Sequence, residues 1–285
     1  MVRRLIRNGL VSSESVKQAV SAVDRGDFIP NSKRRYLDRA VLVGHGSQIS
    51  APHIHARALE LLAKHAKKGS RILDIGSGSG YISVALATMG ADVIGVEHIP
   101  ELVSQSLRNI RKRHRHLLES KQLQIIAGDA RTLSSARITV NNANVTVTET
   151  ENETEKESET GTTGFDGIHC GAAIDEVPDW MWALLKEGGR AVFPLGKEGE
   201  TQYLSYADKR TTTCTSSTRT CRLGLGLGLG LGEEEVKEVK DDVKVAIHRL
   251  FPVVYVPLTD PTWQRERWRN IEVDPYDDDD DDDDD

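Results

Sequence analysis

The sequence contains few cysteines and no long apolar run, and each absence argues against a class of protein. Its three cysteines, Cys170, Cys214 and Cys221, have neither the spacing of metal ligands nor an even-numbered disulfide framework. No apolar run approaches the length of a membrane span. The basic N-terminus lacks the sustained apolar core of a secretory signal. These features predict a soluble cytoplasmic protein that does not associate with membranes.

Apolar residues are also scarce, at 38% of the 285 residues, which predicts insertions outside a folded core. The formal net charge is -7, but the nine aspartates of residues 277–285 account for all of it. Without those nine charges the balance would be +2, so the acidity says little about partners of the folded part. The basic run at residues 108–116 has no interleaved aromatic residues, and we therefore expect no nucleic-acid partner.

One stretch combines a short apolar run, residues 72–75, with glycines at positions 76, 78 and 80. A helical pattern follows from Tyr81 to Met89, so the stretch predicts a strand, a tight turn and a helix start. Such a turn presents bare backbone amides to a ligand at a helix N-terminus. In an open α/β sheet this place is the carboxyl end of a strand, where ligands bind.

The glycine spacing indicates which ligand the turn accepts. A dinucleotide fingerprint would need glycine where this chain has Tyr81. The observed pattern, D-x-G-x-G-x-G from Asp74, resembles motif I of Rossmann-like methyltransferases, which bind S-adenosylmethionine. An acid just before the turn suits the ammonium group of that cofactor. The alternative is a glycine-rich turn in an α/β protein without a nucleotide.

Residues 49–56, Ile-Ser-Ala-Pro-His-Ile-His-Ala, point to a narrower family. They resemble the substrate loop and helix of the protein L-isoaspartate (D-aspartate) O-methyltransferases. The segments around Asp24 and after His98, and residues 256–264, are also similar to that family. The resemblance implies an α/β fold with a Rossmann-like, doubly wound, mostly parallel sheet and a C-terminal antiparallel hairpin, the class I methyltransferase fold.

Two acids follow later strands and are candidates for cofactor contacts. Glu97 ends an expected strand 23 residues after Asp74, where a carboxylate can accept hydrogen bonds from ribose hydroxyls. Its alternative is a solvated carboxylate at a strand end. Asp129 follows the next expected strand, and the resemblance implies a contact with the adenine amino group. It can also cap the following turn.

The resemblance assigns the acceptor side to Ser50, whose hydroxyl would hold the substrate carboxylate together with Ala51 and Val256. The alternative for Ser50 is a capping role at the next helix. Gln48 stands where the family commonly has threonine. The cofactor-binding residues implied are Gln48, Ile49, His55, Asp74, Gly76, Ser77, Gly78, Gly80, Glu97, His98, Asp129, Ala130, Thr259 and Gln264. No metal is expected, because His53 and His55 would point to different helix faces.

The implied reaction transfers a methyl group from S-adenosylmethionine to the free carboxylate of isoaspartyl residues in damaged proteins and peptides, which initiates their repair. Such a carboxylate is already ionised at neutral pH, so no general base is required. Alignment and exclusion of water are then the main tasks. Two alternatives stay open: a methyltransferase with another acceptor, and a cofactor-binding adaptor without activity. A monomer is expected.

Composition divides the chain into segments. We expect an N-terminal helical and substrate-loop segment at 1–70, and a cofactor-binding catalytic domain at 71–133 and 165–273. The Asn-, Thr- and Glu-rich stretch 134–164 cannot bury enough apolar surface and predicts a disordered insertion. Residues 209–241 contain repeated Leu-Gly pairs and are predicted to be a flexible insertion. Residues 274–285 are predicted to be an acidic disordered tail.

The hydrophobic periodicity predicts the other elements. Residues 3–28 and 101–118 are expected to be helices, and a further helix is expected from Pro52 onward. Residues 36–46 show few periodic signals and are predicted to be a loop.

Overall fold

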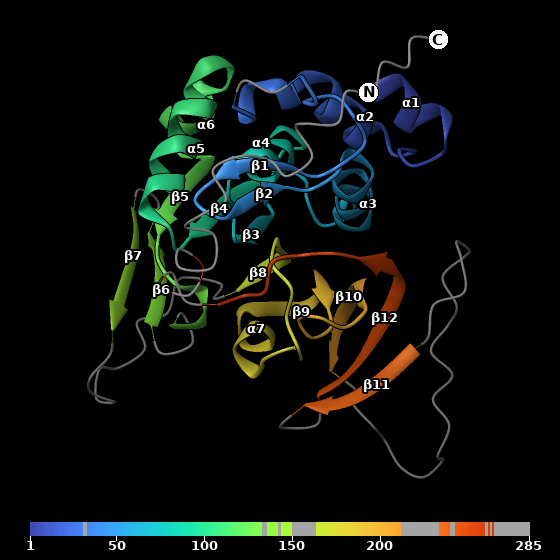
Figure 1. Cartoon of the computed structure of the whole chain (residues 1–285). Helices are drawn as coiled ribbons and strands as arrows, with labels where there is room; N and C mark the ends of the chain where they lie inside the picture. Colours follow the sequence, from blue (N-terminus) through green and yellow to red (C-terminus); the bar gives the residue numbers. More distant parts are fainter. Residues whose placement is uncertain are drawn as a thin grey trace.

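The computed structural model describes residues 1–30, 33–132, 136–141, 144–149, 164–211, 234–239, 243–259, 262 and 264. Within these residues an eight-stranded sheet has the strand order β11-β12-β10-β9-β8-β3-β4-β5 (Figure 1). Its strands are β3 Arg71–Ile75, β4 Asp92–Glu97, β5 Leu123–Ala127, β8 Phe165–Cys170, β9 Leu185–Leu195, β10 Gln202–Thr211, β11 Glu234–Val239 and β12 Val243–Val253.

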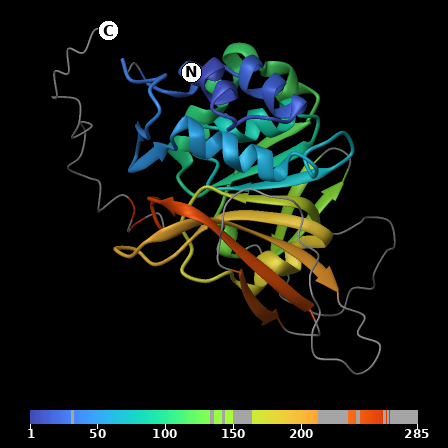
Figure 2. The same ribbon diagram turned by 90° about the vertical axis from the view of Figure 1, so that its right-hand side faces the viewer.

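The sheet has a parallel and an antiparallel part. Strands β5, β4, β3, β8 and β9 pair in parallel, whereas β10, β12 and β11 continue the sheet in antiparallel pairs. Figure 2 shows the antiparallel strands below the helical layer, with β12 running diagonally across. The fold class expected from the sequence is therefore confirmed.

Helices cover both faces of the parallel part. The helical elements are α1 Val2–Arg7, α2 Glu14–Ala22, η1 Arg25–Phe28, α3 Pro52–Leu62, α4 Tyr81–Thr88, α5 Pro100–Arg113, α6 Arg115–Glu119, η2 Ala130–Thr132 and α7 Asp179–Leu184. On β3, Ile72 packs in the apolar cluster that contains Leu62 of α3. The next residue, Leu73, packs in a second cluster with Trp182 of α7. Successive strand residues point to opposite faces, so both faces are buried, as a parallel sheet requires.

The N-terminal segment is not one helix over residues 3–28, as the periodicity predicted. It is divided into α1, α2 and η1, and Gly9 between the first two has φ 69°, a left-handed conformation. Ser13 is the N-cap residue of α2, but its side chain makes no capping bond. Instead its hydroxyl donates to Glu60 of α3 at 2.6 Å, and its N–H donates to the same carboxylate at 2.8 Å. The contact with α3 therefore takes the place of a side-chain cap on α2.

The predicted loop at residues 36–46 contains a strand. β1 (Val41–Gly44) pairs antiparallel with β2 (Ser47–Ile49), and the turn between them uses positive φ angles at His45 and Gly46. Strands of four and three residues are too short to give a clear alternation in the sequence. The predicted helix at 101–118 is likewise divided, because α5 ends before His114 and α6 begins after it.

Parts of both predicted insertions form strands. β6 (Ala136–Asn141) and β7 (Asn144–Glu149) pair only with each other, with Ile138 opposite Val147 in the register. β11 extends the main sheet beside β12. β-branched residues, which favour strands, are present in each of them, such as Ile138, Val147 and Val236. The remaining residues of the insertions, and the tail at 274–285, lie outside the described residues.

Candidate active site

A cavity of about 340 Å³ lies at the carboxyl ends of the parallel strands. The predicted site residues that line it are Gln48, Ser50, Ala51, Gly76, Glu97, His98, Asp129, Ala130, Val256 and Gln264. The lining residues that sequence reasoning did not name as site residues are Ala40, Ser47, His53, Ile54, Ile75, Val96, Gly128, Gly171, Ala172, Pro252, Val253, Val254, Tyr255, Pro257 and Leu258. The predicted residues outside the lining are Ile49, His55, Asp74, Ser77, Gly78, Gly80 and Thr259.

Two turns of bare backbone meet at the cavity. The first follows β3, where Gly76, Gly78 and Gly80 have φ angles of 67°, 50° and 88°, a region that favours glycine. The second follows β8, where the Gly171 N–H donates to the carbonyl of Ile75 at 2.7 Å. A Cβ on Gly171 would lie 2.8 Å from the Gly76 oxygen, so the two turns can approach this closely only because Gly171 lacks a side chain.

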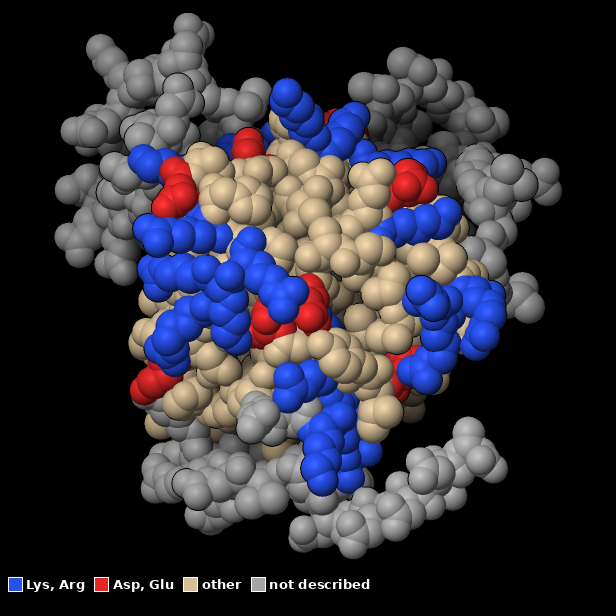
Figure 3. All heavy atoms as spheres, turned by 90° about the horizontal axis from the view of Figure 1, so that it is seen from above, with Lys and Arg blue, Asp and Glu red and all other residues tan. Residues whose placement is uncertain are grey.

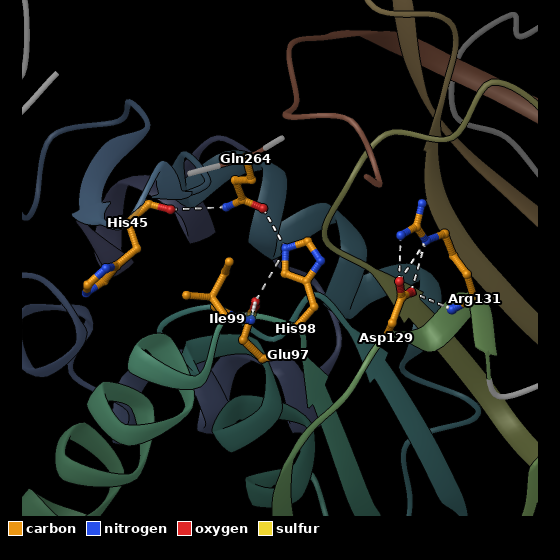
Figure 4. A network of polar contacts seen from close by, with 8 residues as sticks. His45, Glu97, His98, Ile99, Asp129, Arg131 and Gln264 are labelled. Carbon is orange, nitrogen blue, oxygen red and sulfur yellow. Dashed lines mark hydrogen bonds and ion pairs between the residues drawn. The ribbon is translucent and has the colours of Figure 1, made fainter. Parts of the chain in front are cut away.

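Glu97 at the end of β4 is buried, and backbone amides hold its carboxylate. One oxygen accepts the N–H of Gly78 at 3.0 Å and the other accepts that of Ile99 at 2.9 Å (Figure 4). Burial raises the pKa of Glu97, although these N–H groups partly oppose that shift. Each carboxylate oxygen has a second lone pair and can still accept a hydroxyl of a ligand.

Asp129 lies at the cavity wall beside Arg131. The Arg131 guanidinium contacts the carboxylate at 2.6 Å, and the Arg131 N–H donates to it at 2.9 Å (Figure 4). Burial alone would raise the pKa of Asp129, but these bonds outweigh it and lower the pKa. The capping role expected of Asp129 is therefore present, and the carboxylate also lines the cavity.

Asp74 does not lie where the sequence suggested. Its side chain is buried beneath the turn, and both oxygens have protein partners. One is 2.7 Å from His169 Nδ1, and the other accepts the Ser83 hydroxyl. The reason is the register of the sheet, which places Asp74 directly opposite His169 of β8. These bonds fix the turn, and the contact of Asp74 with the cofactor's ammonium group stays a prediction.

His55 also points away from the cavity. Its Nδ1 lies 3.4 Å from the Arg25 guanidinium, and its ring stacks on Tyr81 with centroids 5.0 Å apart. Burial, followed by the charge of Arg25, lowers the pKa of His55 well below 6.5. The imidazole is therefore neutral and belongs to the packing between α3 and α4. Its contact with the cofactor stays a prediction.

Ser50 lies on the cavity wall just before α3 and is free of the capping role that was its alternative. The N-cap residue of α3 is Ala51, whose carbonyl accepts the N–H groups of Ile54 and His55. Across the same cavity, burial raises the pKa of Tyr255 to about 12, and Ser50 partly opposes that shift. Proline at the first helical position restricts the backbone at the start of α3. Ser50, two residues earlier, is therefore held at the cavity wall by a rigid helix start.

Gln264 closes one side of the cavity. A hydrogen bond of 2.6 Å joins its Oε1 to His98 Nε2, and its Nε2 donates to the His45 carbonyl at 3.3 Å (Figure 4). The residue therefore connects the end of β4 with the turn of the β1–β2 hairpin. Among the described residues, no group of His, Cys, Asp or Glu side chains could hold a metal ion. None of the described helices is long and apolar enough to cross a membrane.

A mostly parallel sheet with helices on both faces, and a glycine turn beside a cavity at its carboxyl edge, are features of Rossmann-like α/β proteins, among them the class I methyltransferases. The family model for protein-L-isoaspartate (D-aspartate) O-methyltransferase (PCMT) matches residues 1–223. The chain therefore belongs to this family.

Relatives with known names agree with this placement. Protein-L-isoaspartate O-methyltransferase 1 of Arabidopsis thaliana is 38% identical over 200 residues, 69% of this chain and 76% of the relative. The Caenorhabditis elegans enzyme is 35% identical over 212 residues, 73% and 82% of the two chains. A Plasmodium falciparum protein assigned to the same family, solved with S-adenosyl-L-homocysteine, has a TM-score of 0.63 and 29% identity. That match covers 90% of this chain and 96% of the other.

Proposed function

We propose that the protein transfers a methyl group from S-adenosylmethionine to the free carboxylate of isoaspartyl residues in damaged proteins and peptides, and so initiates their repair. One observation carries this proposal. A single cavity joins the glycine turn and Glu97, suited to the cofactor, with Ser50 and Val256, suited to the acceptor. Membership of the PCMT family supports the same reaction.

The cavity fits S-adenosylmethionine chemically. Gly76, Glu97 and Asp129 line it. The bare backbone at Gly76 would hold the amino-acid end, Glu97 would accept the ribose hydroxyls, and Asp129 would accept the adenine amino group. In this arrangement the cofactor supplies an electrophilic methyl group on a sulfonium. The protein needs no metal for that chemistry.

On the acceptor side the protein has to align an anion. The isoaspartyl carboxylate is ionised at neutral pH, so no residue has to remove a proton. Ser50 donates its hydroxyl to one carboxylate oxygen, and Ala51 and Val256 flank the group. Gln264 and the segment after β12 limit access of water, which would otherwise compete for the methyl group. Positioning provides most of the rate increase.

A transfer assay tests this function. The protein is incubated with labelled S-adenosylmethionine and two peptides that differ only in a normal or isoaspartyl linkage. Label in the isoaspartyl peptide alone is the expected result. Label in both peptides or in other acceptors would indicate a different methyltransferase, and cofactor binding without transfer would indicate an adaptor.

We further propose that the protein acts as a monomer in the cytoplasm, without nucleic-acid or membrane partners. Its substrates would be damaged proteins and peptides that it contacts only briefly. Sedimentation at several concentrations tests the oligomeric state, and a concentration-dependent increase in mass would contradict a monomer.

A further inference from the structure

His53 lines the cavity but has no task in the proposed function. It lies in the first turn of α3, three residues after Ser50, and both residues belong to the cavity wall. Its side chain is 39% exposed, which is far more than the 7% of the neighbouring residue His55. A ligand in the cavity can therefore reach the His53 ring, whereas the ring of His55 serves packing.

Asp38 holds His53 by two hydrogen bonds to one oxygen. Asp38 Oδ1 accepts the backbone N–H of His53 at 3.0 Å and lies 2.8 Å from His53 Nδ1. The backbone and the ring of one residue are thus tied to the same atom, so the ring has a defined orientation despite its exposure. Within the described part of the chain, the other ring nitrogen, Nε2, has no hydrogen-bond partner.

The chemistry of Asp38 decides which ring nitrogen carries the proton. Burial alone would raise the pKa of Asp38, but its bonds to His53 outweigh burial and hold the pKa below the usual range. The carboxylate is therefore ionised at neutral pH and only accepts hydrogen bonds, so Nδ1 carries the proton. In the neutral imidazole Nε2 is then an acceptor, which is suited to an N–H group of a ligand.

A peptide acceptor offers such N–H groups next to the reacting carboxylate. One belongs to the isoaspartyl residue itself, and the other belongs to the residue that is joined to its side-chain carbonyl. The carboxylate only accepts hydrogen bonds, so a ring nitrogen that also accepts is not suited to bind it.

We propose that His53 is an acceptor-binding residue whose Nε2 accepts one of these two N–H groups while Ser50 holds the carboxylate. The inference rests on the proposed function and deepens it. With His53 the site recognises a peptide backbone beside the carboxylate and so favours peptides over small carboxylic acids.

Peptides methylated on a backbone nitrogen test this contact. The wild-type protein and His53→Asn are assayed with an isoaspartyl peptide and with two versions of it, each N-methylated at one of the two positions. One of the two methylations should lower kcat/KM of the wild-type protein about tenfold, mainly through KM. His53→Asn should lose about tenfold with the unmodified peptide and little more on methylation, because the contact is already absent.

The variants separate the two ring nitrogens. Asparagine has an amide near the place of Nδ1, where it can still contact Asp38, but it has no atom at the place of Nε2. His53→Gln can bring an amide oxygen to the place of Nε2 and should recover part of the activity and of the response to methylation.

His116→Asn is the matched control, because His116 is exposed on α6 outside the cavity lining. This variant should respond to both methylations as the wild-type protein does. Affinity for S-adenosyl-L-homocysteine should stay within about twofold in all three histidine variants, since none of these side chains is assigned to the cofactor in this role.

Several outcomes would overturn the role of His53. Equal losses on methylation in the wild-type protein and in His53→Asn would show a steric effect without a hydrogen bond. Full activity of His53→Asn, or a wild-type protein that is indifferent to both methylations, would exclude the contact while the proposed function stands. Lost affinity for S-adenosyl-L-homocysteine in His53→Asn would place the residue on the cofactor side. If the wild-type protein transfers no methyl group to the unmodified isoaspartyl peptide, the proposed function fails and the role fails with it.

Discussion

At the scale of single residues, two buried acids with similar sequence contexts have different tasks. Asp74 binds His169 and Ser83 and does not line the cavity, whereas Glu97 lines it and accepts the backbone N–H groups of Gly78 and Ile99. The sequence places each acid at the end of a strand, and both were natural candidates for the cofactor. Partners from β8 and α4 hold the Asp74 side chain beneath the turn.

Glu97→Gln should weaken binding of S-adenosyl-L-homocysteine about tenfold or more, measured by calorimetry. A glutamine amide would turn an NH₂ group toward the N–H of Gly78 or Ile99, and it has fewer lone pairs for ribose hydroxyls. Glu119→Gln, on the exposed surface of α6, is the control for loss of one negative charge. Equal affinities of the two variants would exclude a role of Glu97 in cofactor binding.

Ser50→Ala should lower kcat/KM for an isoaspartyl peptide at least tenfold, because a hydrogen bond to a charged acceptor is worth about 1.5–3 kcal/mol. Affinity for S-adenosyl-L-homocysteine should remain nearly intact, since Ser50 is assigned to the acceptor. Steady-state kinetics and calorimetry measure the two quantities. A loss of cofactor binding in this variant would contradict the assignment.

At the scale of elements, the site depends on the close approach of two turns that follow parallel strands. Gly171→Ala places a Cβ 2.8 Å from the Gly76 oxygen, and overpacking of this kind costs about 1–3 kcal/mol. We expect reduced stability in urea unfolding and weaker binding of S-adenosyl-L-homocysteine.

Gly199→Ala is the comparison for Gly171→Ala. It also introduces a side chain in a turn, at φ 80°, but nothing lies within 4 Å of the added Cβ. This variant should lose some stability and keep its affinity for the cofactor product. If both variants bind S-adenosyl-L-homocysteine equally well, the close approach of the two turns is not required for cofactor binding.

Asp166 connects the first residues of three strands. One oxygen accepts the Arg71 N–H at 2.8 Å and contacts Lys186 Nζ at 2.9 Å. Burial raises the pKa of Asp166, but these bonds outweigh it and hold the pKa below 3.8. Because the pKa is lower in the folded state, this stabilisation is present above 3.8 and is lost as the pH falls through the folded-state value.

Asp166→Asn should therefore lower the unfolding free energy by about 1 kcal/mol near neutral pH. This value is small because water partly screens the ion pair with Lys186. Below the folded-state pKa the two proteins should differ much less. Urea unfolding across the acidic range measures this difference. A constant gap at every pH would contradict the electrostatic explanation.

At the scale of the whole molecule, charge is unevenly distributed. On the face seen from above in Figure 3, Lys and Arg side chains cover more of the surface than Asp and Glu side chains do. Basic residues also end two of the helices: Arg4 and Arg7 lie in the last turn of α1, and Arg111, Lys112 and Arg113 in that of α5. The nine aspartates of residues 277–285 reverse the sign of the net charge of the chain. Solubility and encounter with charged proteins depend on this balance.

Deletion of residues 137–161 should change the melting temperature by no more than about 2 °C, because weakly connected segments contribute little to global stability. In the described part of this segment, β6 and β7 pair only with each other and not with the main sheet. Calorimetric scanning measures the melting temperature. A large decrease would show that the hairpin packs on the catalytic domain.

By itself, the sequence determined the parallel sheet, the glycine turn between β3 and α4, and the Ser50 loop before α3. Each of these is a local pattern, because glycine conformation, strand burial and a proline helix start depend on neighbours in the chain. The resemblance to the PCMT family rested on the same short segments.

Only the tertiary structure decided which side chains reach the cavity. Asp74 and His55 are turned to buried partners by the β3–β8 register and by Arg25. Tyr255 and Gln264, more than 150 residues from the glycine turn, arrive through the strands and segments that bring the C-terminal part beside the hairpin. The physical reason is that side-chain direction follows from pairing and packing between distant segments, which no local pattern encodes.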